Sequence, residues 1–137
     1  MTHRIRPALE QHLAAMPGVL PVAHQNWPFP GEGQERPDRY LECYLIPARN
    51  RSMSLRYKTA LHSGIFQINV SYPAAIGAGQ AEQMAAQLQA HFAPGGLALE
   101  FGGITVRITG KPDVGSPLDH RPGQYVIPVS ISYESIF

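Results

Sequence analysis

The side chains best suited to bind a metal ion are six histidines and one cysteine. Two histidines four residues apart on a helix, or a pair of cysteines, would predict a zinc site, since zinc is bound by imidazole nitrogens and thiolates at such spacings. No two histidines have that spacing, and Cys43 is the sole cysteine, so the sequence predicts no metal site. We interpret the histidines as scattered surface or half-buried residues: His3, His12, His24, His62, His91 and His120.

Motifs for covalent catalysis or cofactor binding are also missing from the sequence. A reactive cysteine needs an electropositive and accessible site, whereas Cys43 lies in an apolar segment, and no Gly-x-Ser-x-Gly motif occurs. Gly77 and Gly79 resemble the start of a dinucleotide fingerprint, but Glu82 stands where that fingerprint needs Gly or Ala. We therefore predict no catalytic residue and no cofactor, although residues distant in sequence can still assemble an acid–base pair.

Residues 49–62 form the most distinctive segment, because they are basic and include no Asp or Glu. The default interpretation is a solvated hairpin tip, and the sharper one is a basic arm that grips an acidic partner surface. A second candidate contact is an aromatic pair in a Pro/Gly-rich loop, which either packs on the core or anchors an interface. The candidate partner-binding residues are Arg49, Arg51, Arg56, Lys58, His62, Trp27 and Phe29.

Length and composition favour a globular protein that binds other proteins. The 137 residues fit one domain, 1–137, and a hydrophobic content of 44% is enough for a core. A charged content of only 15% suits a surface partly covered by other subunits, and the net charge of +1 disfavours nucleic acid as a partner. The single cysteine permits no intramolecular disulfide, and we find neither a signal peptide nor an apolar run that could span a membrane.

The apolar periodicity predicts an α+β fold. Apolar residues at helical spacing predict helices at about 3–16 and 79–92. The strands are predicted at 19–25, 40–48, 64–72, 97–101, 104–109 and 125–133. Pro128 suggests that the last strand lies at an edge or carries a bulge. The order α-β-β-β-α-β-β-β predicts an antiparallel or mixed sheet of about six strands with two helices packed on one face.

An ordered set of short motifs resembles the bacteriophage tail terminator-like family over nearly the whole chain. The motifs are Met16-Pro17-Gly18, Asn26-x-x-Phe29, Tyr40-Leu41, Gly64-x-Phe66-Gln67-Ile68-x-Val70, Pro73-x-x-x-Gly77-x-Gly79, His91-Phe92, Gly103-x-x-Val106-x-Ile108, Pro112-x-Val114-Gly115 and Tyr125-x-x-Pro128-Val129-Ser130-Ile131. Each motif alone is an ordinary strand or turn, so the resemblance rests on their order.

The resemblance implies a virion structural protein of a phage or prophage and no enzymatic activity. Tail terminators to which the chain is similar form a hexameric ring that caps the tail tube and presents a surface to the head connector. The implied partners are further copies of the chain, the tail tube protein and the head–tail connector protein, with no membrane. The implied location is the virion tail, preceded by the bacterial host cytoplasm.

Three alternatives stay open on the sequence alone. The first is another minor tail or head–tail connector protein of the same small fold, because fold does not fix function. The second is a small nucleic-acid-binding module that uses residues 49–62, whose affinity should fall steeply with salt. The third is a small hydrolase or ligand-binding domain, which would need a deep polar cleft.

Overall fold

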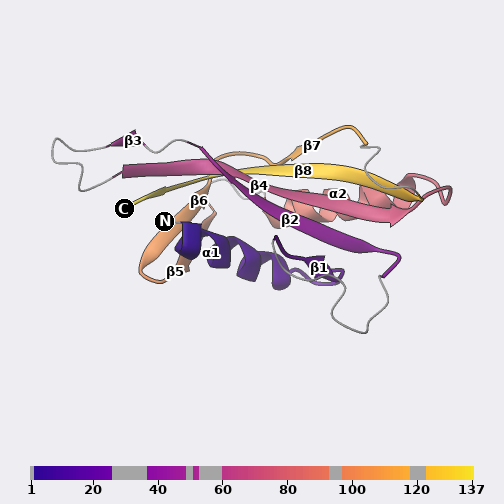
Figure 1. The fold of residues 1–137 in the computed structure, drawn as a ribbon, viewed down its shortest axis with the longest axis horizontal. Coiled ribbons are helices and arrows are strands. Elements are labelled where there is room, and N and C mark those ends of the chain that lie inside the picture. The colour runs from indigo at the N-terminus through magenta and orange to yellow at the C-terminus, as the bar shows by residue number, and fades with distance from the viewer. Residues whose placement is uncertain (1, 26–36, 49–50, 53–59, 93–96, 118–122) are drawn as a thin grey trace.

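The computed structural model describes residues 2–25, 37–48, 51–52, 60–92, 97–117 and 123–137. Within these residues two helices and eight strands follow one another in an α+β order, which confirms the predicted fold class (Figure 1). The elements are α1 (Thr2–Ala14), β1 (Val22–Ala23), β2 (Tyr40–Pro47), β3 (Arg51–Ser52), β4 (Ala60–Pro73), α2 (Gly79–His91), β5 (Ala98–Phe101), β6 (Ile104–Ile108), β7 (Asp113–Val114) and β8 (Gln124–Ile136). Neither helix is long and apolar enough to cross a membrane.

The strands of the described residues form one mixed sheet in the order β1-β2-β4-β8-β6-β5. Two short strands lie off this path, with β3 paired to β4 and β7 paired to β8. Only β1 and β2 are parallel; every other pairing is antiparallel. The long strands β4 and β8 pair without a break from Leu61↔Ile136 to Pro73↔Gln124 and form the longest ladder of the sheet.

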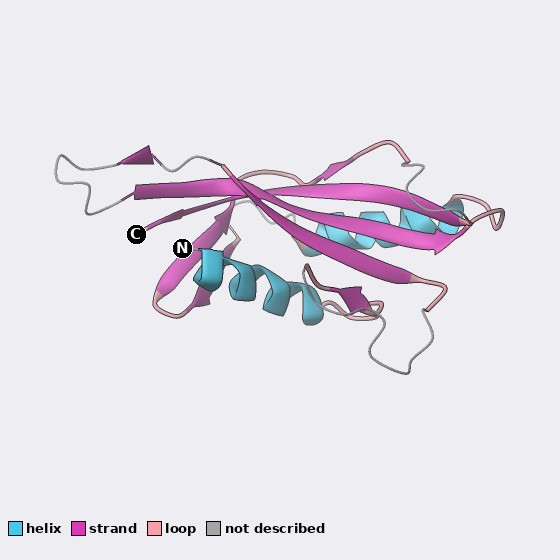
Figure 2. Cartoon of the chain, viewed as in Figure 1, coloured by secondary structure: helices cyan, strands magenta, loops and turns pink. Residues whose placement is uncertain are grey.

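Both helices contribute to one hydrophobic core on a single face of the sheet (Figure 2). Alternate residues of each strand point toward this face, as the period of two requires. On β4, for example, Phe66, Ile68 and Val70 are fully buried in the core. Helix α1 packs on β5 and β6, and α2 packs on β8, β4 and β7. We call the opposite side of the sheet the outer face.

Three predicted details of the strands differ from the structure. The first predicted strand, 19–25, is reduced to Val22–Ala23. The third predicted strand, 64–72, begins four residues earlier, at Ala60, because β3 and the end of β8 supply partners on both sides of residues 60–62. The last strand is not bulged against β4 and lies inside the sheet, because β6 pairs with β8 at residues 133–134 and β7 pairs with it at residues 129–130. The Pro128 carbonyl accepts from Gly115 N–H at 2.8 Å on the β7 side, and the N–H and C=O of one residue in an antiparallel strand point to the same side. Its missing N–H therefore faces the side away from the continuous ladder with β4.

A pair of histidines joins the carboxyl ends of the two helices. His12 Nε2 lies 2.9 Å from the His91 carbonyl, and His91 Nε2 lies 2.6 Å from the His12 carbonyl. Because a carbonyl only accepts, each Nε2 must carry its proton and donate. The rings stack at 3.9 Å between centroids. This reciprocal pair gives the His91 carbonyl a donor and gives the His12 carbonyl a second one beside the Ala15 N–H at 3.2 Å.

Acid is expected to destabilise this helix junction. Burial lowers the pKa of His12 in the folded chain below its ordinary value of 6.5. At a pH between the folded-state and unfolded-state pKa of His12, the unfolded chain therefore binds more protons than the folded chain. Stability should therefore be full at neutral pH and fall as the pH decreases through about 6.5. We expect Tm to decrease from pH 7.5 to pH 5, and to decrease less in His12→Gln, which keeps a donor but does not titrate. Equal pH dependence in both proteins would show that His12 is not the responsible group.

Candidate partner-binding surface

Most of the residues predicted to bind a partner fall outside the described part of the chain. These are Trp27, Phe29, Arg49, Arg56 and Lys58. Arg51 belongs to β3, where only its backbone is described. His62 lies in β4, is only 7% exposed and stacks on Phe137 at 3.9 Å between ring centroids. Burial lowers the pKa of His62 below its ordinary value, so this ring is neutral at pH 7 and adds no charge to the basic segment.

The strand β3 and the adjoining end of β4 form a projection that extends beyond α1 and the β5–β6 hairpin (Figure 1). Arg51 pairs with Leu61, and Ser52 pairs with Ala60. On the other side of β4, the N–H and C=O of Ala60 are paired with Phe137 at 3.0 and 3.2 Å. Paired backbone on both sides of β4 gives this projection an ordered base. The described parts of the basic segment 49–62, which are residues 51–52 and 60–62, therefore belong to this projection.

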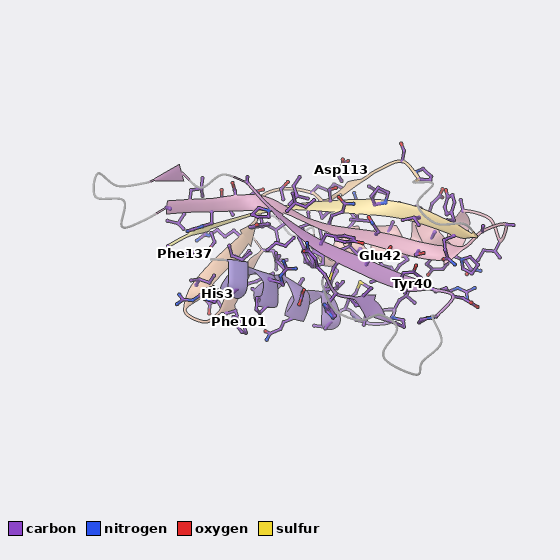
Figure 3. The ribbon with its side chains drawn as sticks, in the orientation of Figure 1. His3, Tyr40, Glu42, Phe101, Asp113 and Phe137 are labelled. Atoms are coloured by element: carbon purple, nitrogen blue, oxygen red, sulfur yellow. The ribbon has the colours of Figure 1, made fainter. Side chains whose placement is uncertain are left out.

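The middle of the outer face is polar and largely buried. Glu42 and Asn69, on β2 and β4, are cross-strand partners and are 3% and 4% exposed; Figure 3 labels Glu42. Tyr44 donates its hydroxyl hydrogen to Glu42 Oε2 at 3.1 Å, and Gln67 Nε2 donates to Asn69 Oδ1 at 2.8 Å. Buried polar groups of this kind require partners, and these bonds supply some of them. This part of the outer face is an internal network rather than an open surface.

Toward the projection the outer face carries exposed isoleucines among polar residues. Ile46 and Ile65 are direct cross-strand partners and are 48% and 38% exposed. Ile136 lies further out, opposite Leu61, and is 55% exposed. We call these three residues the isoleucine patch. Their parity places them on the side of the sheet away from both helices, so the core does not account for them.

The sequence carries a signal for this patch, which is an apolar residue on the polar side of a strand. Ile65 alternates with Gln67, Asn69 and Ser71 on the polar side of its strand, where an isoleucine has no core to join. Single exposed apolar residues on a surface are normal. Here Ile46 and Ile65 are adjacent, and Ile136 lies on the same face beyond Ser63 and Glu134. Only the strand register brings Ile46 next to Ile65.

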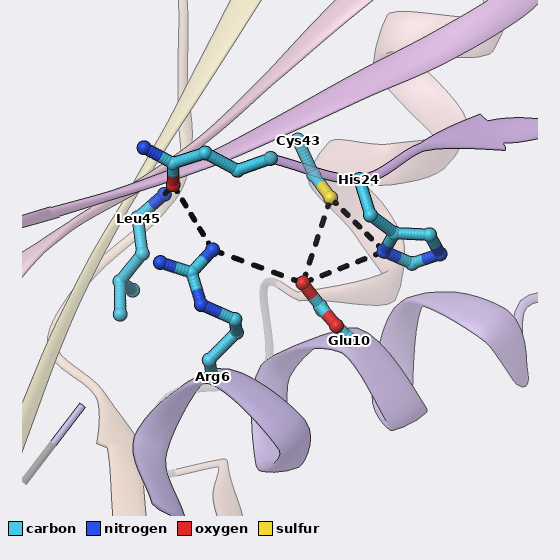
Figure 4. Close-up of polar contacts among 6 residues, drawn as sticks. Arg6, Glu10, His24, Cys43 and Leu45 are labelled. Atoms are coloured by element: carbon cyan, nitrogen blue, oxygen red, sulfur yellow. Dashed lines mark hydrogen bonds and ion pairs between the residues drawn. The ribbon is translucent and has the colours of Figure 1, made fainter. Parts of the chain in front are cut away.

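A polar cluster lies on the other side of the sheet, between α1 and the β1–β2 edge (Figure 4). Cys43 Sγ is 3.6 Å from His24 Nδ1 and 3.9 Å from Glu10 Oε1. No sequence motif predicts this cluster, because its members are 14 and 19 residues apart with no regular spacing.

The cluster does not have the geometry of a nucleophilic triad. A triad histidine uses one ring nitrogen for the nucleophile and the other for the carboxylate. Here the same atom, His24 Nδ1, faces both Cys43 and Glu10, the latter at 3.4 Å. Burial, with the charge of Glu10, raises the pKa of the Cys43 thiol to about 12, so the thiol stays protonated.

One hollow in the described part of the chain lies between β6 and β8. It has a volume of about 260 Å³ and is lined by Thr105, Arg107, Glu134, Ser135 and Ile136. Ligand pockets typically enclose roughly 300–1,000 Å³ and are mainly apolar. This hollow is smaller and carries Arg107 and Glu134, so it does not have the character of a typical ligand site.

The chain is similar to known proteins both in sequence and in structure. A family model described as "Phage tail terminator protein" matches residues 4–133. A protein of known structure is similar to the chain with a TM-score of 0.75 and 32% sequence identity, over 100% of this chain and 96% of that chain. No curated protein sequence matches.

Proposed function

The chain belongs to the phage tail terminator protein family, and on that premise we propose that it caps the tail tube and joins the tail to the head connector. Membership makes it a structural protein of the phage tail, in a family that is structural rather than catalytic. The resemblance seen in the sequence motifs is thereby confirmed over residues 4–133. The proposal adds the particular role, the ring and the partners.

The observation that supports this role is a set of exposed isoleucines beside the projection of β3 and β4. The isoleucine patch is exposed on the outer face, and Ile136 lies opposite Leu61, which pairs with Arg51 in the projection. A cap must contact the end of a tube over a defined area, and apolar residues surrounded by polar ones suit such a contact. We assign the isoleucine patch to contact with the tail tube protein, and the basic segment 49–62 to an acidic surface of that partner.

Ring formation requires a second surface on each subunit. The sheet of the described residues ends in β1 on one side and in β5 on the other, so two different edges are available. A ring of identical subunits joins unlike surfaces through a rotation that closes. Edge strands can supply such contacts by pairing with a neighbouring chain. The proposed assembly is a hexameric ring that forms in the host cytoplasm and persists in the virion tail.

The decisive experiment measures the particle mass and the binding to tail tubes. Light scattering behind size exclusion, over a wide concentration range, is expected to show a ring-sized species or a monomer that forms rings only on purified tubes. Binding should be restricted to tube ends, and sub-stoichiometric protein should stop tube growth. A protein that stays monomeric and binds no tube would refute the capping role.

Two alternatives are separated by the same set of measurements. Another minor tail or head–tail connector protein of this fold would bind a different tail component and leave tube length unchanged. A nucleic-acid-binding module would shift DNA at low salt, with an affinity that decreases as salt increases. The net charge of +1 is the observation against the second alternative.

Replacing Ile65 with aspartate is expected to weaken tube binding roughly 30-fold or more, as loss of a central apolar contact does. A charge at this position would have to be desolvated in the complex, whereas in the free protein the side chain is 38% exposed. The matched control is Ile76→Asp, at a residue that is 44% exposed and precedes α2. Equal tube binding by both variants and the wild type would exclude the isoleucine patch from the interface.

A further inference from the structure

Three potential metal ligands meet on the helical side of the sheet, each from a different element. Glu10 belongs to α1, His24 directly follows β1, and Cys43 belongs to β2. Their ligand atoms, Glu10 Oε1, His24 Nδ1 and Cys43 Sγ, all lie within 4.8 Å of one another. Figure 4 shows the three atoms at the corners of one triangle.

The contacts that join these atoms are long: the thiol makes weak hydrogen bonds to His24 Nδ1 at 3.6 Å and to Glu10 Oε1 at 3.9 Å. His24 Nδ1 and Glu10 Oε1 are 3.4 Å apart, longer than the roughly 2.7–3.2 Å of a normal N–H···O bond. Arg6 Nη1 is 3.9 Å from the same oxygen and donates instead to Gln25 Oε1 at 3.0 Å. Among the described residues, the carboxylate oxygen is therefore approached from three directions without a short hydrogen bond.

The same spacing does match three ligands around one tetrahedral cation. Zinc lies about 2.3 Å from a sulfur ligand and about 2.0–2.2 Å from a nitrogen or oxygen ligand. In a tetrahedron these values put a sulfur about 3.6 Å from a nitrogen or oxygen ligand, and put nitrogen and oxygen ligands about 3.4 Å from each other. The observed edges are 3.6 Å for Cys43–His24, 3.9 Å for Cys43–Glu10 and 3.4 Å for His24–Glu10. Two edges agree with tetrahedral coordination, and the third is longer by a few tenths of an ångström.

We propose that Glu10, His24 and Cys43 bind a divalent cation of the zinc class, with the fourth position open to a water molecule. Thiolate and imidazole ligands select zinc over magnesium and calcium, which prefer oxygen. Cys43 is fully buried, whereas the side chain of His24 is 42% exposed and leaves a path for the ion from solvent. Binding replaces the thiol proton with the metal, as it does when a metal coordinates a thiol.

Neighbouring residues hold the segment that carries His24 in place. Gln25 Oε1 accepts from the backbone N–H of Leu45 at 3.1 Å and from Arg6 Nη1 at 3.0 Å (Figure 4). These two bonds attach the residue after His24 to both β2 and α1. The bound cation would also link α1, the residues that follow β1, and β2. Its role is therefore to fix α1 against the β1–β2 edge. The inference does not depend on the proposed tail role.

The test uses the full-length, tag-free protein, because a histidine tag would itself bind the probe. Titration with Co²⁺ is expected to give a thiolate-to-cobalt charge-transfer band and the intense bands of tetrahedral cobalt, with one ion per chain. Zn²⁺ should displace the cobalt and raise Tm by several degrees, since a ligand that binds only the folded state stabilises it. His24→Ala is expected to lower the affinity on the order of 100-fold, since even outer partners of ligands cost 10–100-fold.

The matched control is His3→Ala, which removes another exposed histidine from the N-terminal helix and should leave metal binding unchanged. Cys43→Ser should abolish the charge-transfer band. If Cys43→Ser does not fold, His24→Ala alone tests the metal site, because the His24 side chain lies at the surface and its removal should not prevent folding. A wild-type protein without a charge-transfer band, or an affinity that His24→Ala does not change, would overturn the proposal.

Discussion

Replacing Phe66 with alanine is expected to lower the free energy of unfolding by about 3–5 kcal/mol, the usual loss for a buried phenylalanine. Phe66 is fully buried near the middle of β4, the strand that pairs with both β2 and β8. Its ring lies 6.3 Å from that of Phe92, the residue that follows α2. The cavity would therefore open between the central strand and a helix, where neither side can easily move to fill it.

Urea unfolding followed by circular dichroism measures this effect. Total stabilities are typically about 5–15 kcal/mol, so the variant should remain folded but unfold at a much lower urea concentration, with an unchanged m-value. The matched control is Phe101→Ala, because Phe101 is only partly buried at the end of β5 and should lose considerably less. Losses of similar size at both positions would contradict the assignment of Phe66 to the centre of the core.

The sequence predicts best those elements whose core-facing apolar residues recur at a regular spacing. In α1, Ile5, Leu9 and Leu13 were expected to form an apolar stripe, and all three are at most 2% exposed. The Gly102-Gly103 turn was also predictable, since both residues have positive φ, 59° and 83°, as the turn of a two-residue hairpin often requires. Periodicity and turn chemistry are local, so a single sequence contains them.

Short strands and long-range contacts are not predictable in this way. The strands β3 and β7 have two residues each, too few for any period to be visible. His12 and His91 are 79 residues apart, and only the packing of both helices on one face brings their rings together. The cluster of Glu10, His24 and Cys43 depends in the same way on the parallel register of β1 with β2. Its ligands therefore follow no sequence motif.

The predicted contact residues illustrate the same limit. The basic composition of 49–62 was visible in the sequence, but the interruption of the strand pattern made the whole segment look like a loop. The structure extends β4 back to Ala60, so His62 pairs with Ser135 in the sheet. The isoleucine patch arises because Ile46 on β2 is placed opposite Ile65 on β4. A pairing between two strands cannot be read from either strand alone.

Replacing Gly64 with alanine is expected to destabilise the protein by about 3 kcal/mol, at the upper end of the range for overpacking. A Cβ at this position would collide with the Ile46 carbonyl oxygen, and would lie 2.7 Å from the Tyr133 hydroxyl and 2.9 Å from Pro47 Cα. Two of these atoms belong to the backbone of β2 and cannot turn aside. Gly64 is the register partner of both Pro47 and Tyr133, so the clash lies where three strands meet.

The reason for glycine at this point is the close approach of β2 and Tyr133 to the core side of β4. A loss of this size should lower Tm by roughly 10 °C or more in a thermal scan. Gly79→Ala is the matched control, because no atom lies within 4 Å of its added Cβ and the residue begins α2. That variant should be neutral or stabilised by up to about 1 kcal/mol, since alanine lowers the entropy of the unfolded chain. If Gly64→Ala unfolded at the same temperature as Gly79→Ala, β2 would have to lie further from β4 than the register places it.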